Sequence, residues 1–139
     1  MADHRDGLPV LVVDGARFSD IDGFAHEFSR LLCHHTWQGN LDAFNDILRG
    51  GFGTPGNGWV LRWFNSDSSR SALGHQAKTR WLEAVLLTCH PSNRPSVEAR
   101  IADARQGKGP TLFDDIVDII RDHGPGGEEA EDGILLELL

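Results

Sequence analysis

The sequence predicts an α/β fold with a small three-stranded parallel sheet packed by helices. Three short apolar segments with strand-like composition occupy residues 10–14, 59–64 and 134–138. Helical periodicity fills the chain between them, and strands separated by helices favour a parallel sheet. The length of 139 residues is enough for one domain with a real core, so we expect residues 1–139 to form a single domain.

The first half of the chain is expected to begin with a strand and a helix. Residues 10–14 form a continuous apolar run, typical of a strand that is buried on both faces. Ser19 is a candidate N-cap for the helix that follows. The apolar positions of that helix are Ile21, Phe24, Ala25, Phe28, Leu31 and Leu32. Residues 50–58 are glycine-rich and predict a loop before the second strand.

The second half of the chain is expected to hold helices and then the third strand. Residues 65–71 are polar and indicate a turn, after which a longer helix is predicted over residues 72–87. A shorter helix is predicted over residues 96–105, after two prolines. Thr111 is a good N-cap for the last helix. The apolar stripe of that helix is Phe113, Ile116, Val117 and Ile120.

The most informative segment is residues 40–48, which read as a short amphipathic helix with Asn40 as its N-cap. Its apolar stripe is Leu41, Phe44, Ile47 and Leu48. Asp42, Asn45, Asp46 and Arg49 fall on the opposite face. Two acids one turn apart cost an isolated helix about 0.2–0.5 kcal/mol. Asp46 also lies toward the helix end where the dipole opposes negative charge. Such a surface favours a positively charged partner.

Composition excludes several classes of function. The net charge is −8, with 21 acids against 13 Lys and Arg, which argues against a nucleic-acid-binding surface. An acidic protein is suited to meeting a basic partner, because opposite charge speeds encounter. The N-terminus does not resemble a signal peptide, and no segment predicts a membrane span. With two cysteines in the chain, we expect a cytoplasmic protein with reduced thiols.

The segment from Trp37 to Leu48, W-Q-G-N-L-D-A-F-N-D-I-L, resembles the barstar family of ribonuclease inhibitors. The resemblance implies a three-stranded parallel sheet in the order strand, helix, short acidic helix, strand, helices, strand. The order and position of the elements agree over residues 10–64 and 111–138. The middle, residues 75–110, is longer than in compact members of the family. We expect this middle part to be an added helical insert at the margin of the sheet.

The resemblance also implies a function and its residues. In the family, the acidic helix and the preceding loop plug the active site of a secreted guanyl-preferring ribonuclease, and one aspartate takes the place of a substrate phosphate. Asp46 matches that aspartate. Asn45 and Thr36 stand where compact members carry aromatic residues, and Asp118 is the nearest match to a later glutamate that contributes to binding. The predicted partner-binding residues are Asp42, Asp46, Asn45, Trp37, Thr36, Gln38, Asn40, Phe52 and Asp118.

No motif predicts catalysis or a bound metal. Cys33-His34-His35 and Cys89-His90 lack the spacing of a structural zinc site, so we read small buried cysteines and partly exposed histidines, with no metal and no cofactor. A G-x-S-x-G nucleophile motif is absent from the sequence.

We therefore expect a non-enzymatic intracellular inhibitor of a small basic microbial ribonuclease of the barnase type, monomeric when free. It would bind neither nucleic acid nor membrane. The rival interpretations are an immunity protein for a different nuclease toxin and a small α/β enzyme that uses its histidines.

Overall fold

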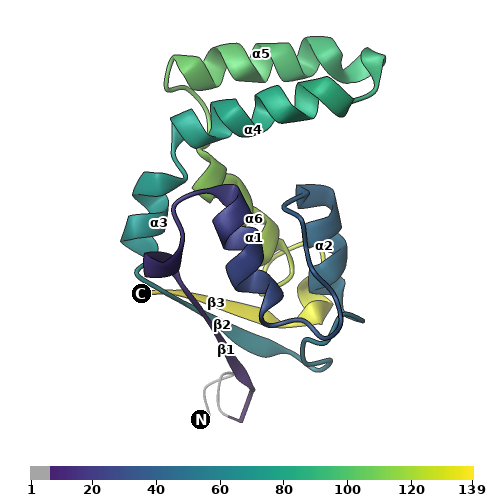
Figure 1. The fold of residues 1–139 in the computed structure, drawn as a ribbon. Helices are drawn as coiled ribbons and strands as arrows, with labels where there is room; N and C mark the ends of the chain where they lie inside the picture. The colour runs from purple at the N-terminus through teal and green to yellow at the C-terminus, as the bar shows by residue number, and fades with distance from the viewer. Residues whose placement is uncertain (1–6) are drawn as a thin grey trace.

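A computed structural model describes residues 7–139, in which a three-stranded parallel sheet carries helices on one face (Figure 1). The strands are β1 (Val10–Asp14), β2 (Trp59–Phe64) and β3 (Ile134–Leu138). They lie in the order β1-β2-β3, and both pairings are parallel. The α/β class and the parallel direction of the sheet are confirmed.

Strand β1 lies at an edge of this sheet and is not buried on both faces, so that part of the prediction is wrong. Its partner is β2, with Val10 opposite Val60. Alternate side chains of β1 point away from the helices, and Val10 and Val12 remain 41% and 40% exposed. Val13 points the other way and is fully buried in the core. Val10 and Val12 are exposed because the helices cover one face of the sheet, and the local run of residues does not show which faces are covered.

The two helices between β1 and β2 are α1 (Ile21–Ser29) and α2 (Leu41–Arg49). The N-cap of α1 is Asp20 rather than Ser19, because the Asp20 carboxylate accepts a hydrogen bond of 2.7 Å from the backbone N–H of Gly23. Helix α2 has the predicted bounds. It ends at Gly50, whose φ of 114° is a conformation that favours glycine.

Residues 65–71, predicted as a turn, are mostly helical in the structure. They belong to α3 (Ser66–Ala72), and the following helix, α4 (His75–Thr88), begins three residues later than predicted. Two of the serines that look like turn residues, Ser66 and Ser69, are buried. The side chain of Ser69 is fully buried and accepts a hydrogen bond of 3.0 Å from the indole N–H of Trp63. This partner lies on β2, so the polar pattern alone is misleading.

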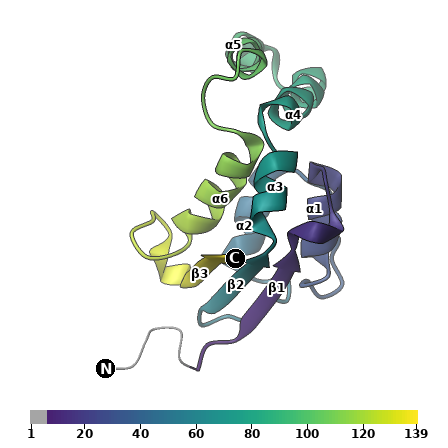
Figure 2. The same ribbon diagram turned by 90° about the vertical axis from the view of Figure 1, so that its left-hand side faces the viewer.

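Residues 75–110 form a helical hairpin and contribute no strand, as predicted for the insert. Its second helix is α5 (Arg94–Arg105), which begins two residues before Ser96 because Pro95 is tolerated in a first helical turn. The hairpin has its own small apolar core of Leu82, Val97 and Ile101. It lies beyond the helix layer, at the end of the molecule far from the sheet, and not at the margin of the sheet (Figures 1 and 2).

The last helix, α6 (Leu112–Asp122), lies in the helix layer, where it packs against β3, α2 and α3 and contacts α4 at the base of the hairpin. The ammonium group of Lys78, which is buried, donates to the carbonyl of Pro110 at 3.2 Å and to the carboxylate of Asp115 on α6.

The short 3-10 helices are η1 (Gly15–Arg17), η2 (Pro91–Asn93) and η3 (Ala130–Asp132). No helix within residues 7–139 combines the length and apolar character needed to cross a membrane.

A capping box at the start of α6 makes the stability of the protein pH-dependent. Thr111 Oγ1 accepts from the Asp114 backbone N–H at 3.1 Å, and the Asp114 carboxylate accepts from the Thr111 backbone N–H at 3.0 Å. The bond from the Thr111 backbone lowers the pKa of the Asp114 carboxyl below its ordinary value of 3.8. The stabilisation is therefore complete above pH 3.8 and is lost as the pH falls through the lowered value.

We expect Asp114→Asn to reduce the free energy of unfolding by about 0.5–1 kcal/mol near neutral pH. The difference from the wild type should shrink as the pH falls below 3.8. Urea unfolding at several pH values between 6 and 3 measures it. Asp118→Asn, at an exposed position of the same helix, controls for the loss of one charge. A difference for Asp114→Asn that stays constant with pH would contradict this role.

Candidate functional site

Helix α2 presents its acids because its other face is locked into the core. The predicted apolar stripe of Leu41, Phe44, Ile47 and Leu48 is buried, with exposed fractions from 0% to 9%. Asp42 and Asp46 are exposed on the opposite face. Asp42 has no hydrogen bond or ion pair with any residue in 7–139, so its carboxylate is available to a partner.

The loop before α2 is anchored by Trp37, which is a core residue. Only 3% of Trp37 is exposed, its ring stacks on Phe44 with centroids 4.6 Å apart, and its indole N–H donates to the Asn40 carbonyl at 2.7 Å. The Trp37 backbone N–H donates to Ser29 Oγ on α1 at 2.9 Å. Although Trp37 lies in a loop, its ring is buried and therefore does not offer a surface for a partner. Trp37 holds the start of α2 in position instead.

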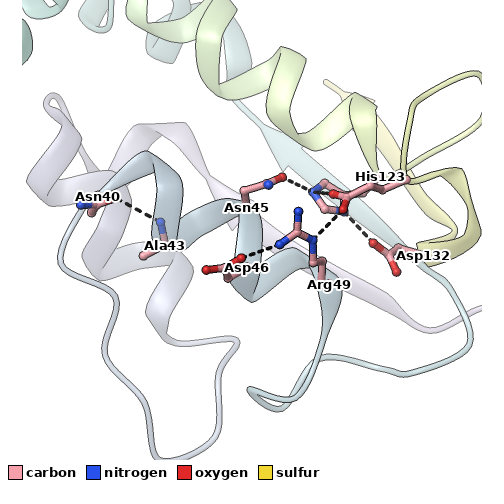
Figure 3. Close-up of polar contacts among 8 residues, drawn as sticks. Asn40, Ala43, Asn45, Asp46, Arg49, His123 and Asp132 are labelled. Carbon is pink, nitrogen blue, oxygen red and sulfur yellow. Dashed lines mark hydrogen bonds and ion pairs between the residues drawn. The ribbon is translucent and has the colours of Figure 1, made fainter. Parts of the chain in front are cut away.

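The other predicted residues of this loop are at the surface. Thr36, Gln38 and Asn40 are exposed. Asn40 is the N-cap of α2, as predicted, and its side-chain oxygen accepts from the Ala43 backbone N–H at 3.0 Å (Figure 3). Gly39, with φ of 99°, makes the turn between Gln38 and Asn40. The side-chain oxygen of Asn40 already accepts one hydrogen bond, so the amide nitrogen is the group of this side chain that is free to donate to a partner.

Two predicted residues lie outside this loop and helix. Phe52 follows α2 and is half-buried, with its ring centroid 4.7 Å from that of His35. Asp118 is exposed on α6. Helices α2 and α6 pack against each other, but none of the interactions of the described residues joins the Asp118 side chain to α2. The role of Asp118 in binding stays a prediction.

Asp46 is paired with Arg49, which lies on the same face of the helix. Its carboxylate accepts a hydrogen bond of 2.6 Å from Arg49 Nη1, while Arg49 Nε donates to Glu129 at 2.6 Å (Figure 3). The hydrogen bond to Glu129 raises the pKa of the Arg49 guanidinium. The Asp46 side chain is still 65% exposed, so Arg49 orients the carboxylate without covering it.

Behind this pair lies a buried histidine that the sequence did not reveal. His123 has no exposed surface, and its Nδ1 lies 2.7 Å from Asp132 Oδ2. Its Nε2 lies 2.6 Å from Asn45 Oδ1 and 3.2 Å from Glu129 Oε2 (Figure 3). Both ring nitrogens thus face oxygen acceptors. Asn45, predicted to meet a partner, is instead held from behind by His123. The run of acids after a helix-ending His-Gly is the only sequence signal for this cluster.

Three residues of this cluster, His123, Glu129 and Asp132, are the metal-binding candidate among residues 7–139. Ligand atoms of His123, Glu129 and Asp132 lie within 4.8 Å of one another. The two carboxylates, however, contact opposite nitrogens of the imidazole ring, so the three side chains do not converge on one point. The ring nitrogens make their hydrogen bonds with Asp132 and Asn45, whereas Glu129 Oε2 is a buried atom without a hydrogen-bond partner. Cys33 is exposed and Cys89 half-buried, so the expectation of buried cysteines is wrong.

The fold and the site together define a small α/β protein that offers acidic side chains on a rigid helix. Carboxylates fixed in this way accept charge-assisted hydrogen bonds from arginine or lysine of a partner. The model of the family described as Barstar (barnase inhibitor) matches residues 8–98, and the chain belongs to this family of protein inhibitors. The match includes β1, α1, α2, β2, α3, α4 and the first part of α5, whereas α6 and β3 lie beyond it. No curated protein and no solved structure matches the chain.

We expect His123→Ala to lower the free energy of unfolding by about 3 kcal/mol, because it removes a fully buried side chain and the hydrogen bonds that the ring makes with Asn45 and Asp132. Chemical denaturation measures the loss. His26→Ala removes an exposed histidine of α1 and should change stability by less than about 0.5 kcal/mol. Equal stability of the two variants would show that the buried cluster does not support the fold.

Proposed function

We propose that this protein inhibits a guanyl-preferring ribonuclease by covering its active site with α2 and the loop of residues 36–40. The observation that carries the proposal is the pair of exposed carboxylates, Asp42 and Asp46, on a helix whose opposite face is fixed in the core of a barstar-family chain. A ribonuclease active site holds cations that stabilise phosphate charge. Carboxylates offer those cations the same acceptor chemistry as a phosphate does.

The pairing of Asp46 with Arg49 supports preorganisation of the site. Arg49 is itself held by Glu129, at the edge of the buried His123 cluster. The Asp46 carboxylate therefore has a preferred orientation before any partner arrives. Binding through a side chain that is already fixed costs less conformational entropy than binding that must first order a free side chain. The nuclease would add its own donors to the exposed part of this carboxylate.

The mode of inhibition is occlusion, with no bond made or broken. Among the predicted contact residues, Thr36, Gln38, Asp42 and Asp46 lie at the surface on consecutive elements. The excess of acids over bases would speed the approach of a basic enzyme. We propose that the protein acts inside the cell that makes the nuclease, before the enzyme is exported.

We expect Asp46→Ala to weaken inhibition of a guanyl-preferring ribonuclease by about 100-fold or more, because the cations of the enzyme would be desolvated without a counter-charge. Stability should change by less than about 0.5 kcal/mol, since an exposed pair with Arg49 contributes little. Asp42→Ala should weaken inhibition less and mainly through the association rate. Inhibition constants at low and high salt, together with thermal melts, measure these effects.

Asp67→Ala is the matched control. It removes one exposed carboxylate from α3, on the other side of the molecule from α2 (Figure 1). The control reports the effect of net charge alone, which should be small and should vanish at high salt. If Asp46→Ala inhibits as well as Asp67→Ala, then α2 is not the binding face.

A further inference from the structure

A groove separates the α4–α5 hairpin from the rest of the protein and runs directly beside α2. It consists of two adjoining hollows of about 690 and 490 Å³, and Asn40, Trp81 and Val85 line both. One wall is formed by the start of α1 and by residues 38–42, and the other by α4 and α5. The hairpin extends over α2 from the side opposite the sheet (Figure 1).

The two walls of the groove carry opposite charge. The wall on the side of α1 and α2 contains Asp20, Asp22 and Asp42, whereas the hairpin wall contains Arg80 and Arg100. Both arginines are exposed, and neither has a hydrogen bond or ion pair with any residue in 7–139. Their guanidinium groups are therefore available to a binding partner.

The whole hairpin differs in charge from the rest of the chain. Residues 75–110 contain six Lys and Arg against three acids, a net charge of +3. The remainder contains seven Lys and Arg against eighteen acids, a net charge of −11. A long-range attraction for a basic enzyme would be stronger without these cations. Lys78 already pairs with Asp115 and Arg105 with Glu83. Arg80 and Arg100 have no such pair among the described residues, and an anionic group of the partner would supply one.

We propose that the α4–α5 hairpin is a second contact surface for the nuclease and binds an acidic segment that borders its cationic site. The inference rests on the proposed function, because it assigns the partner of α2 to the groove. Asp42 lines the same hollow as Arg100 and Val97. A nuclease side chain that reaches Asp42 from this side therefore enters between α2 and the hairpin. Its cation would meet Asp42, and a neighbouring carboxylate would meet Arg100 or Arg80.

The apolar part of the groove favours such a contact. Trp81 is half-buried and packs against both the main core and the small core of the hairpin, with Val85 beside it. These side chains give the groove an apolar floor between its charged walls. Ion pairs made over such a floor are partly shielded from water, which strengthens them and makes a mismatched charge costly. The groove would therefore select nucleases that carry an acidic border.

The test compares Arg100→Gln and the double variant R80Q/R100Q with Lys108→Gln in direct binding to a panel of guanyl-preferring ribonucleases. Lys108 is an exposed cation beyond the end of α5 and does not line the groove. Lys108→Gln removes one positive charge, as Arg100→Gln does, and is therefore its control for net charge. We expect R80Q/R100Q to raise the dissociation constant by about tenfold. Lys108→Gln should leave the constant unchanged or lower it slightly. Thermal melts confirm that each variant is folded.

A second readout locates the contact. Arg100→Lys keeps the charge and provides an amine, which a carbodiimide joins to any carboxylate in direct contact. Mass spectrometry of the complex should identify a crosslink from residue 100 to an Asp or Glu of the nuclease. A crosslink to another copy of this chain would overturn the inference in favour of self-association. A loss for R80Q/R100Q that is seen only when RNA is present would overturn it in favour of RNA contact.

The outcomes separate this inference from the proposed function. If Asp46→Ala weakens binding but R80Q/R100Q binds like Lys108→Gln, the inference fails and the proposed function stands. If the wild type binds none of the ribonucleases, the proposed function fails and the inference falls with it. Weaker binding by both groove and α2 variants, with the expected crosslink, supports both.

Discussion

The burial of Phe44 is the constraint on which the presentation of α2 depends. Its ring has no exposed surface and contacts Trp37 at 4.6 Å, Phe28 at 5.0 Å and Phe24 at 5.9 Å between centroids. Full burial of such a side chain is worth about 1.5–3 kcal/mol, and these ring contacts fix its geometry further. Any rotation of α2 about its axis would expose Phe44 and bury an acid. The acidic face is therefore outward because no other orientation satisfies the aromatic cluster.

Polar contacts add precision that apolar packing alone does not give. Trp37 bonds the Asn40 carbonyl and thereby fixes the first turn of α2, while His123 bonds Asn45 and fixes the middle of the helix from behind. Arg49 then joins the last turn to Glu129. These bonds connect α2 to the preceding loop and to the segment of residues 123–129. The helix is short, and isolated helices of this length are marginal, so its rigidity comes from these tertiary contacts.

The sequence predicted α2 accurately because its signals are local. The Asn40 cap, the stripe through Phe44 and the stop at Gly50 all lie within one short segment. Other features depend on partners far along the chain and were missed. The edge position of β1 follows from strand order, and the helix over residues 66–72 is supported by the bond between Ser69 and Trp63. The role of His123 follows from two acids at η3 and an amide on α2. Burial of Trp37 likewise follows from packing on α1 and α2, which the loop composition did not show.

The candidate site also depends on parts of the chain beyond the family match. The match ends at residue 98, yet β3 completes the sheet and His123 supports α2 from the end of α6. In the sequence, the hairpin lies between α3 and α6, yet both of these helices contact the same core. This is possible because the hairpin packs on its own apolar cluster. Because the hairpin has an apolar core of its own, its surface charges leave the interior contacts of its neighbours intact. The hairpin therefore carries a charge opposite to that of the rest of the chain, directly beside α2, without altering the packing that fixes the acidic face.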